Sequence, residues 1–166
     1  GSESTFQPSP RRRFGLLFKE GLEGGVLSDE QITLADRVLS MRSLTVRSEM
    51  VPWHRVTCMG IDVKQSMRQS MIRNMKHTRI PVTNKSGEVQ GVLPVLSALL
   101  EPTSPTQPML IKPLFLTQDT PVRDALQQVR ESGVAMAIIT DANNKPLGIV
   151  TLKDLVEPLV GELSAW

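Results

Sequence analysis

Thr151 and Asp154, near the end of the chain, have the side-chain types and the spacing to bind a small polar ligand. They follow residues 147–150, an apolar run rich in β-branched side chains that predicts a short buried strand. Apolar residues then recur at helical spacing over 155–160, which predicts that a helix begins at this corner. A strand that passes directly into a helix leaves a hydroxyl, a carboxylate and free backbone N–H groups together. Such a corner suits a ribose and a phosphate.

The same two residues also fit a capping box, which needs no ligand. In that arrangement the Thr151 hydroxyl accepts from the Asp154 amide, while the carboxylate reaches back to Thr151. The helix dipole alone stabilises a carboxylate in the first turn by about 0.3–1 kcal/mol. Taken by itself, the pattern favours capping. An internal repeat strengthens the ligand hypothesis, because this corner ends its second copy.

The repeat relates residues 82–84 to 139–141 and residues 91–93 to 148–150, both with an offset of 57 residues. Each copy predicts the order strand, helix, strand, turn, strand, helix. Units of this size cannot bury their sheets separately. We therefore predict an α+β (α/β-like) fold of two pseudo-symmetric β-α-β-β-α units packed sheet to sheet and preceded by an amphipathic helix.

Pseudo-symmetry predicts two equivalent clefts at the seam, one at the last strand-to-helix corner of each copy. Their chemistry differs, because the first copy has Pro94 and Ser97 where the second has Thr151 and Asp154. We therefore expect at most one competent polar site.

Composition shifts and prolines divide the chain into five parts. They are a tag and flexible linker over 1–24, an N-terminal helix region over 25–45, a first unit over 46–101, a proline-rich linker over 102–109 and a second unit over 110–163. Within the first unit we expect an extended or turn segment at 46–51, a strand at 55–59 and a helix at 63–75. Met67 falls on the predicted apolar face of that helix, and Arg68 on its solvated basic face.

Composition also excludes several function classes. The 166 residues are 40% hydrophobic and 22% charged, as in soluble globular proteins, and a net charge of +2 is too small to indicate nucleic-acid binding. One cysteine and two histidines predict neither a disulfide nor a zinc site, and we find no catalytic constellation, so we do not expect an enzyme. The given residues contain no apolar run long enough to span a bilayer, and we expect no signal peptide among them. Gly1-Ser2 is typical of a cloning remnant, and we expect a soluble piece of a longer protein.

Three stretches carry a resemblance to a known family: Thr45-Val46-Arg47-Ser48-Glu49-Met50-Val51-Pro52, His77-Thr78-Arg79-Ile80-Pro81-Val82, and residues 147–155 followed by 160–163. They resemble the tandem CBS (cystathionine-β-synthase-type) domains of the hemolysin C, CorC and cyclin-M group of membrane proteins, which are linked to magnesium and cobalt transport. Residues 25–39 resemble the acidic helix that precedes the pair in this group.

The resemblance implies an adenosine nucleotide (AMP, ADP or ATP, with Mg²⁺) bound at the seam between the units. Asp154 would accept from the ribose hydroxyls, and Thr151 would bond the ribose or a phosphate. Residues from the first unit would form the adenine pocket: Thr78, Ile80 and Pro81, closed by the segment of Val51 and Pro52.

Several positions depart from the family pattern. Val51 replaces a common threonine, and Trp53 replaces a common arginine. Ala135 and Met136 lie where phosphate-binding CBS proteins can carry histidine or arginine, so a charged clamp is missing there. Pro158 should kink the last helix.

Two function hypotheses follow. In the first, the chain is the regulatory module of an integral membrane protein related to divalent-cation transport, on the cytoplasmic face of the membrane. It would sense an adenine nucleotide and act through the geometry of a homodimer on the transmembrane domain of the parent chain. In the second, it is a structural dimerisation platform with decayed clefts. Thr151 and Asp154 favour the first hypothesis, whereas Val51 and the missing clamp favour the second.

Overall fold

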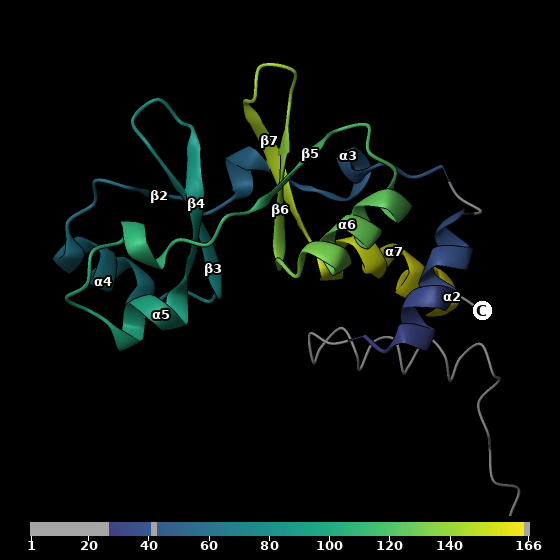
Figure 1. Ribbon diagram of the computed structural model, residues 1–166, viewed down its shortest axis with the longest axis horizontal. Coiled ribbons are helices and arrows are strands. Elements are labelled where there is room, and N and C mark those ends of the chain that lie inside the picture. The colour runs from purple at the N-terminus through teal and green to yellow at the C-terminus, as the bar shows by residue number, and fades with distance from the viewer. Residues whose placement is uncertain (1–26, 41–42, 165–166) are drawn as a thin grey trace, which may run out of the picture.

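Two β-sheets face each other in the computed structural model, which describes residues 27–40 and 43–164 (Figure 1). One sheet has the order β1-β7-β6-β5 and the other the order β2-β3-β4. The strands are β1 (Val51–Pro52), β2 (Met59–Gly60), β3 (Arg79–Thr83), β4 (Val89–Pro94), β5 (Leu114–Thr117), β6 (Met136–Thr140) and β7 (Pro146–Thr151). This arrangement confirms the predicted mixed fold of two units.

Each sheet has its own helices on its outer face. In Figure 1, α4 and α5 accompany β3 and β4, whereas α6 and α7 accompany β6 and β7. The helices are α2 (Asp29–Ser40), α3 (Val46–Glu49), α4 (Gln65–Arg73), α5 (Val95–Leu100), α6 (Val122–Ser132) and α7 (Leu152–Ser164), with 3-10 turns η1 (Trp53–Arg55) and η2 (Gln107–Met109). No helix in the described ranges is long and apolar enough to cross a bilayer.

The two hairpins have the same register. In β3 and β4, Val82 pairs with Gly91, and an irregularity precedes the next pair. In β6 and β7, Ile139 pairs with Gly148, and the same irregularity follows. Each unit also has one parallel pair, β2 with β3 and β5 with β6. The repeat read from the sequence is therefore confirmed strand by strand.

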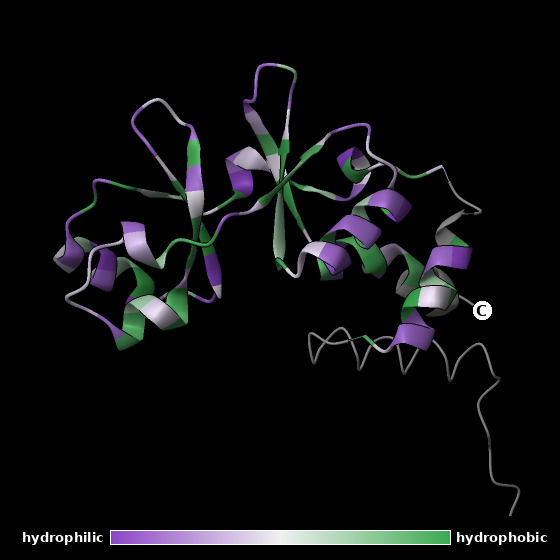
Figure 2. Ribbon diagram, in the orientation of Figure 1, coloured by the Kyte–Doolittle hydropathy of each residue, from purple (hydrophilic) through white to green (hydrophobic). Residues whose placement is uncertain are grey.

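Strand alternation separates the helix-facing core from the seam between the sheets. In β3, Ile80 and Val82 pack into the core of the first unit. In β6, Ala137 and Ile139 belong to the core of the second unit. The intervening side chains turn to the seam, where one cluster is formed by Val92, Met136 and Ile138 with Trp53, Val89 and Ile149. Figure 2 colours hydrophobic residues green, and green segments run along β6 and β7. The predicted sheet-to-sheet packing is present.

Short segments cross between the units. β1 lies near the start of the first unit but pairs antiparallel with β7 of the second unit, Val51 opposite Ile149. Ile111 lies at the start of the second unit but forms an antiparallel bridge to Val92 on β4 of the first unit. Val92 and Ile149 are repeat equivalents, separated by the same 57 residues. The two pairings between the units are therefore related by the pseudo-symmetry, and each adds a segment of one unit to the sheet of the other.

Local structure before α4 differs from the expectation. Residues 46–49 form the short helix α3 instead of an extended segment. The strand expected over 55–59 is reduced to β2, because Trp53–Arg55 form the turn η1, in which the Val56 amide donates to the Trp53 carbonyl (3.0 Å). Packing of Trp53 in the seam accompanies this turn.

The prediction of the faces of α4 was wrong at two neighbouring positions. Met67 is 58% exposed, whereas Arg68 is fully buried. The Arg68 guanidinium donates to the carbonyl oxygens of Ser104 (2.8 Å) and Pro102 (3.2 Å) and to the Thr106 hydroxyl (3.0 Å). These acceptors belong to the linker that follows α5. A buried guanidinium is tolerated because the linker supplies its hydrogen bonds.

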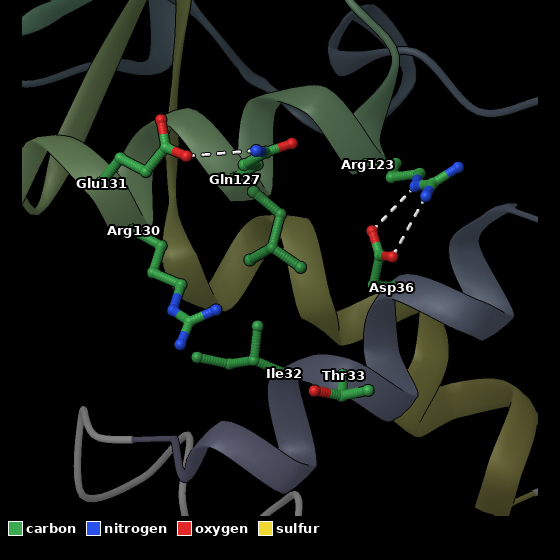
Figure 3. A pocket seen from close by; sticks show the side chains of 8 residues that line it. Ile32, Thr33, Asp36, Arg123, Gln127, Arg130 and Glu131 are labelled. Carbon is green, nitrogen blue, oxygen red and sulfur yellow. Dashed lines mark hydrogen bonds and ion pairs between the residues drawn. The ribbon is translucent and has the colours of Figure 1, made fainter.

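α2 packs on the second unit. Its start is a capping box, which serine followed three residues later by glutamine favours: the Ser28 backbone amide donates to Gln31 Oε1 (2.7 Å) and the Gln31 backbone amide to Ser28 Oγ (3.2 Å). Ala35 is fully buried in the core of the second unit. Figure 3 shows the cleft between α2 and α6, bordered by the ion pair of Arg123 and Asp36 (2.8 Å). The predicted linker over 1–24 and residues 25–26 and 41–42 of the predicted helix region lie outside the described residues.

Candidate functional site

The corner between β7 and α7 forms the expected capping box. The Thr151 amide and hydroxyl both donate to Asp154 Oδ2, at 2.9 and 3.0 Å, and the Asp154 amide donates to Thr151 Oγ1 (3.4 Å). Both bonds to the carboxylate use the same oxygen. Oδ1 is therefore available to accept from a ligand hydroxyl.

The carboxylate of Asp154 is partly buried and therefore partly desolvated. Burial raises its pKa, and this effect exceeds the opposing effect of the two hydrogen bonds from Thr151. A half-buried carboxylate gains from any further donor, because each new hydrogen bond replaces water that burial has removed. Ribose hydroxyls are donors of this kind.

Asp154 borders a cleft of about 410 Å³ between the two units. Five of the seven residues that the resemblance implies line it: Val51, Thr78, Pro81, Thr151 and Asp154. They come from β1, β7, α7 and the region of β3, so only the folded pair brings them together. Val56, Met136 and Ile149 add apolar surface to its walls.

Pro52 does not line the cleft, and neither does Ile80. The side chain of Ile80 is fully buried in the core of the first unit. Alternation along β3 turns Arg79 and Pro81 toward the seam and Ile80 toward the helices. The side chain of Ile80 therefore supports the wall from behind.

Basic side chains that sequence reasoning missed also line this cleft. They are Arg55, His77, Arg79 and Lys153. The period of two along β3 could have identified Arg79, because Pro81 was already placed on the same face. No local signal identifies Arg55, since its position depends on η1 and on the pairing of β1 with β7.

The walls of the cleft are fixed by backbone contacts. The Val95 amide donates to the Thr78 carbonyl (2.9 Å), which ties the start of β3 to the start of α5. The pairing of Val51 with Ile149 holds the other wall. A cleft built on paired strands keeps its shape better than one built on loops.

A second, smaller cleft of about 170 Å³ lies at the equivalent place in the repeat. It is lined by Val92 and Pro94, the equivalents of Ile149 and Thr151 in the first cleft, with Ile111 in the place of Val51. The residues that line it include no carboxylate. The two clefts thus differ in chemistry in the way that Pro94 predicts.

With the fold and the cleft described, comparison with known proteins is informative. Residues 109–161 match the family model of the CBS domain. The second unit is therefore similar to a CBS domain. The first unit repeats its strand and helix order, and the whole has the fold of a CBS-domain pair.

Two solved structures illustrate this likeness. The CBS domain of a bacterial CNNM/CorC family Mg²⁺ transporter in complex with ATP has a TM-score of 0.68 and 22% identity, covering 80% of this chain and 97% of that one. A CBS-domain pair with bound AMP from Klebsiella pneumoniae has a TM-score of 0.65 and 19% identity, covering 71% of this chain and 99% of that one. At these identities the likeness is one of fold.

Among curated proteins, the UPF0053 protein MG146 of Mycoplasma genitalium is 26% identical over 162 residues. The match covers 94% of this chain and 38% of that protein, so the chain spans less than two fifths of its relative's length. The resemblance to a tandem CBS pair of the hemolysin C, CorC and cyclin-M type, read from the sequence, is confirmed.

Proposed function

We propose that this chain is a regulatory CBS pair that senses an adenine nucleotide (AMP, ADP or ATP) in the 410 Å³ cleft. The cleft itself carries the proposal, because both units contribute to it and a hydrogen-bonded carboxylate lies at its edge. Its volume is within the usual range for small-ligand sites, about 300–1,000 Å³. The CBS structures with ATP and AMP give further support.

The binding mode follows from the lining residues. Asp154 accepts from the ribose hydroxyls through Oδ1, and Thr151 stays at the corner as both cap and ligand contact. The apolar walls formed by Val51, Pro81 and Ile149 enclose the adenine, with Thr78 as a polar contact. The described residues include no group of three side chains placed to hold a metal ion, so Mg²⁺ would arrive on the nucleotide phosphates.

The proposed context is an integral membrane protein related to divalent-cation transport, with this module on the cytoplasmic face and no enzymatic role. The resemblance to the CorC group and the name of the ATP-bound neighbour support this context. α2 would carry the signal toward the transmembrane domain, because it packs on the second unit through Ala35 and the Asp36–Arg123 pair. Nucleotide must favour one geometry over another for the signal to pass.

Dimer geometry is the proposed output, and α5 offers the surface for it. Leu96, Leu99 and Leu100 are 67%, 47% and 73% exposed, and Met67 on the adjacent α4 is 58% exposed. Four large apolar side chains exposed on neighbouring helices are typical of a surface that another protein covers. The proposed occupant is a second copy of this chain.

A structural dimerisation platform is the second candidate. The capping box already gives Thr151 and Asp154 a role without ligand. The absence of a carboxylate among the residues of the smaller cleft also fits a pair whose sites have decayed. In this case the α5 surface alone would carry the function.

A thermal melt with AMP, ADP and ATP, each with and without Mg²⁺, separates the two candidates. Nucleotide at one hundred times its Kd should add about 2.7 kcal/mol to the free energy of unfolding. Asp154→Asn keeps a capping side chain but removes the anionic acceptor, and should abolish most of the shift. Asp124→Asn, in the first turn of α6 and outside the cleft, is the matched control. No shift with any nucleotide at millimolar concentration would favour the platform.

A further inference from the structure

The smaller of the two seam clefts differs from the larger one in the polarity of its walls. At three positions related by the 57-residue repeat, a polar residue of the larger cleft is replaced by an apolar one in the smaller cleft. The pairs are His77 with Val134, Thr78 with Ala135, and Thr151 with Pro94. The loss of nucleotide contacts alone would not require an apolar residue at all three positions. The replacements therefore favour a ligand with an apolar body.

The apolar walls of the smaller cleft are fixed by the backbone. Ile111 exchanges two backbone hydrogen bonds with Val92, each of 2.9 Å, which add it to the edge of β4. Pro113 and Met136, at the start of β6, are buried. Ile111, in contrast, is 52% exposed. The cleft thus has apolar surface that is still in contact with water and that a bound group could cover.

Two cations, Arg79 and Lys112, line this apolar cleft. Its lining residues include no carboxylate to balance them. Within residues 27–40 and 43–164, neither side chain forms an ion pair or a hydrogen bond. Both side chains are exposed and can turn toward an anion. A guanidinium binds a planar carboxylate through two parallel hydrogen bonds, so a carboxylate is a suitable partner.

The volume of the smaller cleft limits the size of its ligand. At about 170 Å³ it has less than half the volume of the larger cleft. It is also below the range of about 300–1,000 Å³ that is usual for drug-sized ligands. An apolar cavity of about 150 Å³ can hold benzene. An adenosine would have neither the room nor a carboxylate for its ribose, so the smaller cleft is not a second copy of the larger one.

We propose that the smaller cleft binds a small carboxylate with an apolar body, a short branched or aromatic acid of about six to ten non-hydrogen atoms. The apolar body packs against Ile111, Val134 and Met136, and the carboxylate pairs with Arg79 and Lys112. Inorganic phosphate binds more weakly, because an apolar cleft cannot replace the water around a dianion. This inference goes beyond the proposed nucleotide sensing and does not depend on it.

An amide-proton NMR titration of the isotopically labelled protein, without nucleotide, tests the proposal. The probes are benzoate and isovalerate, compared with benzamide, which has the shape of benzoate without its charge, and with inorganic phosphate. Lys112→Gln removes a cation that lines only the smaller cleft, since Arg79 lines both. Ala135→Leu fills the smaller cleft without a change of charge. Lys145→Gln is the matched control, because Lys145 is exposed between β6 and β7 and lines neither cleft.

Benzoate should bind at least about fivefold more tightly than benzamide, the effect expected of exposed charge pairs. It should also bind more tightly than phosphate, and its largest shifts should fall on the amides of Val134, Ala135 and Met136. Lys112→Gln should weaken benzoate about three- to fivefold. Ala135→Leu should abolish binding, and Lys145→Gln should leave it unchanged. Thermal melts without ligand check that the variants fold, and the wild-type shifts locate the site if Ala135→Leu does not.

Absence of shifts with both acids at millimolar concentration would overturn the site. Equal affinities for benzoate and benzamide would overturn the role of the cations, and phosphate that binds as tightly as benzoate would overturn the role of the apolar walls. Binding that survives Ala135→Leu, or shifts confined to the larger cleft, would overturn the assignment to the smaller cleft. Each of these outcomes leaves the nucleotide melts unaffected, so the proposed function is tested separately.

Discussion

The carboxylate of Asp154 has two roles, one as a helix cap and one as the proposed ribose acceptor. As a helix cap it needs the bonds from Thr151, and as the proposed ribose acceptor it must lie where a ligand can reach it. Its position at the edge of the cleft meets both demands but removes part of its hydration, and burial raises its pKa. The carboxylate is thus less stable as an anion in the folded chain than in water.

The raised pKa of Asp154 predicts how the free energy of unfolding depends on pH. A raised pKa in the folded state means that folding favours the protonated form, so the stability from this group is complete below the ordinary pKa of about 4. It is lost as pH rises through the raised pKa. The free energy of unfolding of the wild type, relative to Asp154→Asn, should therefore fall as pH rises from about 4 and then level off. Urea unfolding of both proteins at a series of pH values measures this difference in the free energy of unfolding. A difference that grows with pH would instead mean that the Thr151 bonds outweigh burial.

Arg68 shows how one buried side chain can hold a linker. Its guanidinium also contacts Gln69 Oε1 (3.0 Å) and the Glu101 carbonyl (3.4 Å), in addition to the acceptors in the linker. Removing it would leave the buried Thr106 hydroxyl without this donor, at a cost of about 1–3 kcal/mol, whereas water can reach the carbonyl oxygens of Glu101 and Pro102.

Arg68→Met should lower the free energy of unfolding by about 1–3 kcal/mol. Arg73→Met, at an exposed position of the same helix, should change it by less than about 0.5 kcal/mol. Chemical denaturation of both variants gives the comparison. A small effect at Arg68 would show that the linker acceptors are satisfied by water once the guanidinium is gone.

At the scale of elements, the crossing of β1 onto β7 requires a close backbone approach. A Cβ at Gly148 would lie 2.5 Å from the Val51 carbonyl oxygen and 2.8 Å from Met50 Sδ. The repeat-related Gly91 has the same constraint, with Leu110 Cβ at 2.8 Å. Glycine at this position in each copy lets the segment from the other unit join the sheet.

Gly148→Ala should lower the free energy of unfolding by about 1–3 kcal/mol, because the blocking atom is backbone and cannot rotate away. It should also weaken nucleotide binding, since Val51 lines the cleft. Gly60→Ala is the control, because its Cβ would meet only Val63 Cγ2 at an ordinary 3.6 Å. If both variants unfold alike, then β1 is not held at this distance in solution.

At the scale of the whole molecule, the exposed apolar side chains of α5 predict self-association. Leu100→Glu places a charge on this surface and should convert a dimer to a monomer. Leu34→Glu, at an exposed position on α2, should leave the dimer intact. Sedimentation velocity over a range of protein concentrations measures the oligomeric state of both variants. A wild type that is monomeric at all concentrations would contradict the proposed dimer.

The sequence alone determined the features that depend on neighbouring residues. The 57-residue repeat predicted both hairpins, and the Ser28–Gln31 and Thr151–Asp154 pairs predicted both capping boxes. Gly133 ends α6 in the left-handed region (φ 67°), as a glycine at that position predicts. These outcomes follow from hydrogen bonds and backbone conformations set within a few residues, so tertiary packing had little to change.

Only the tertiary structure decided the features that depend on partners far along the chain. Arg68 is buried because acceptors more than thirty residues later surround it. Ile80 faces the helices and Arg55 lines the cleft because the sheets pair and pack in one particular register. A helical or alternating pattern shows which residues share a face. Which face is covered, and by what, is settled by the packing of the two units against each other.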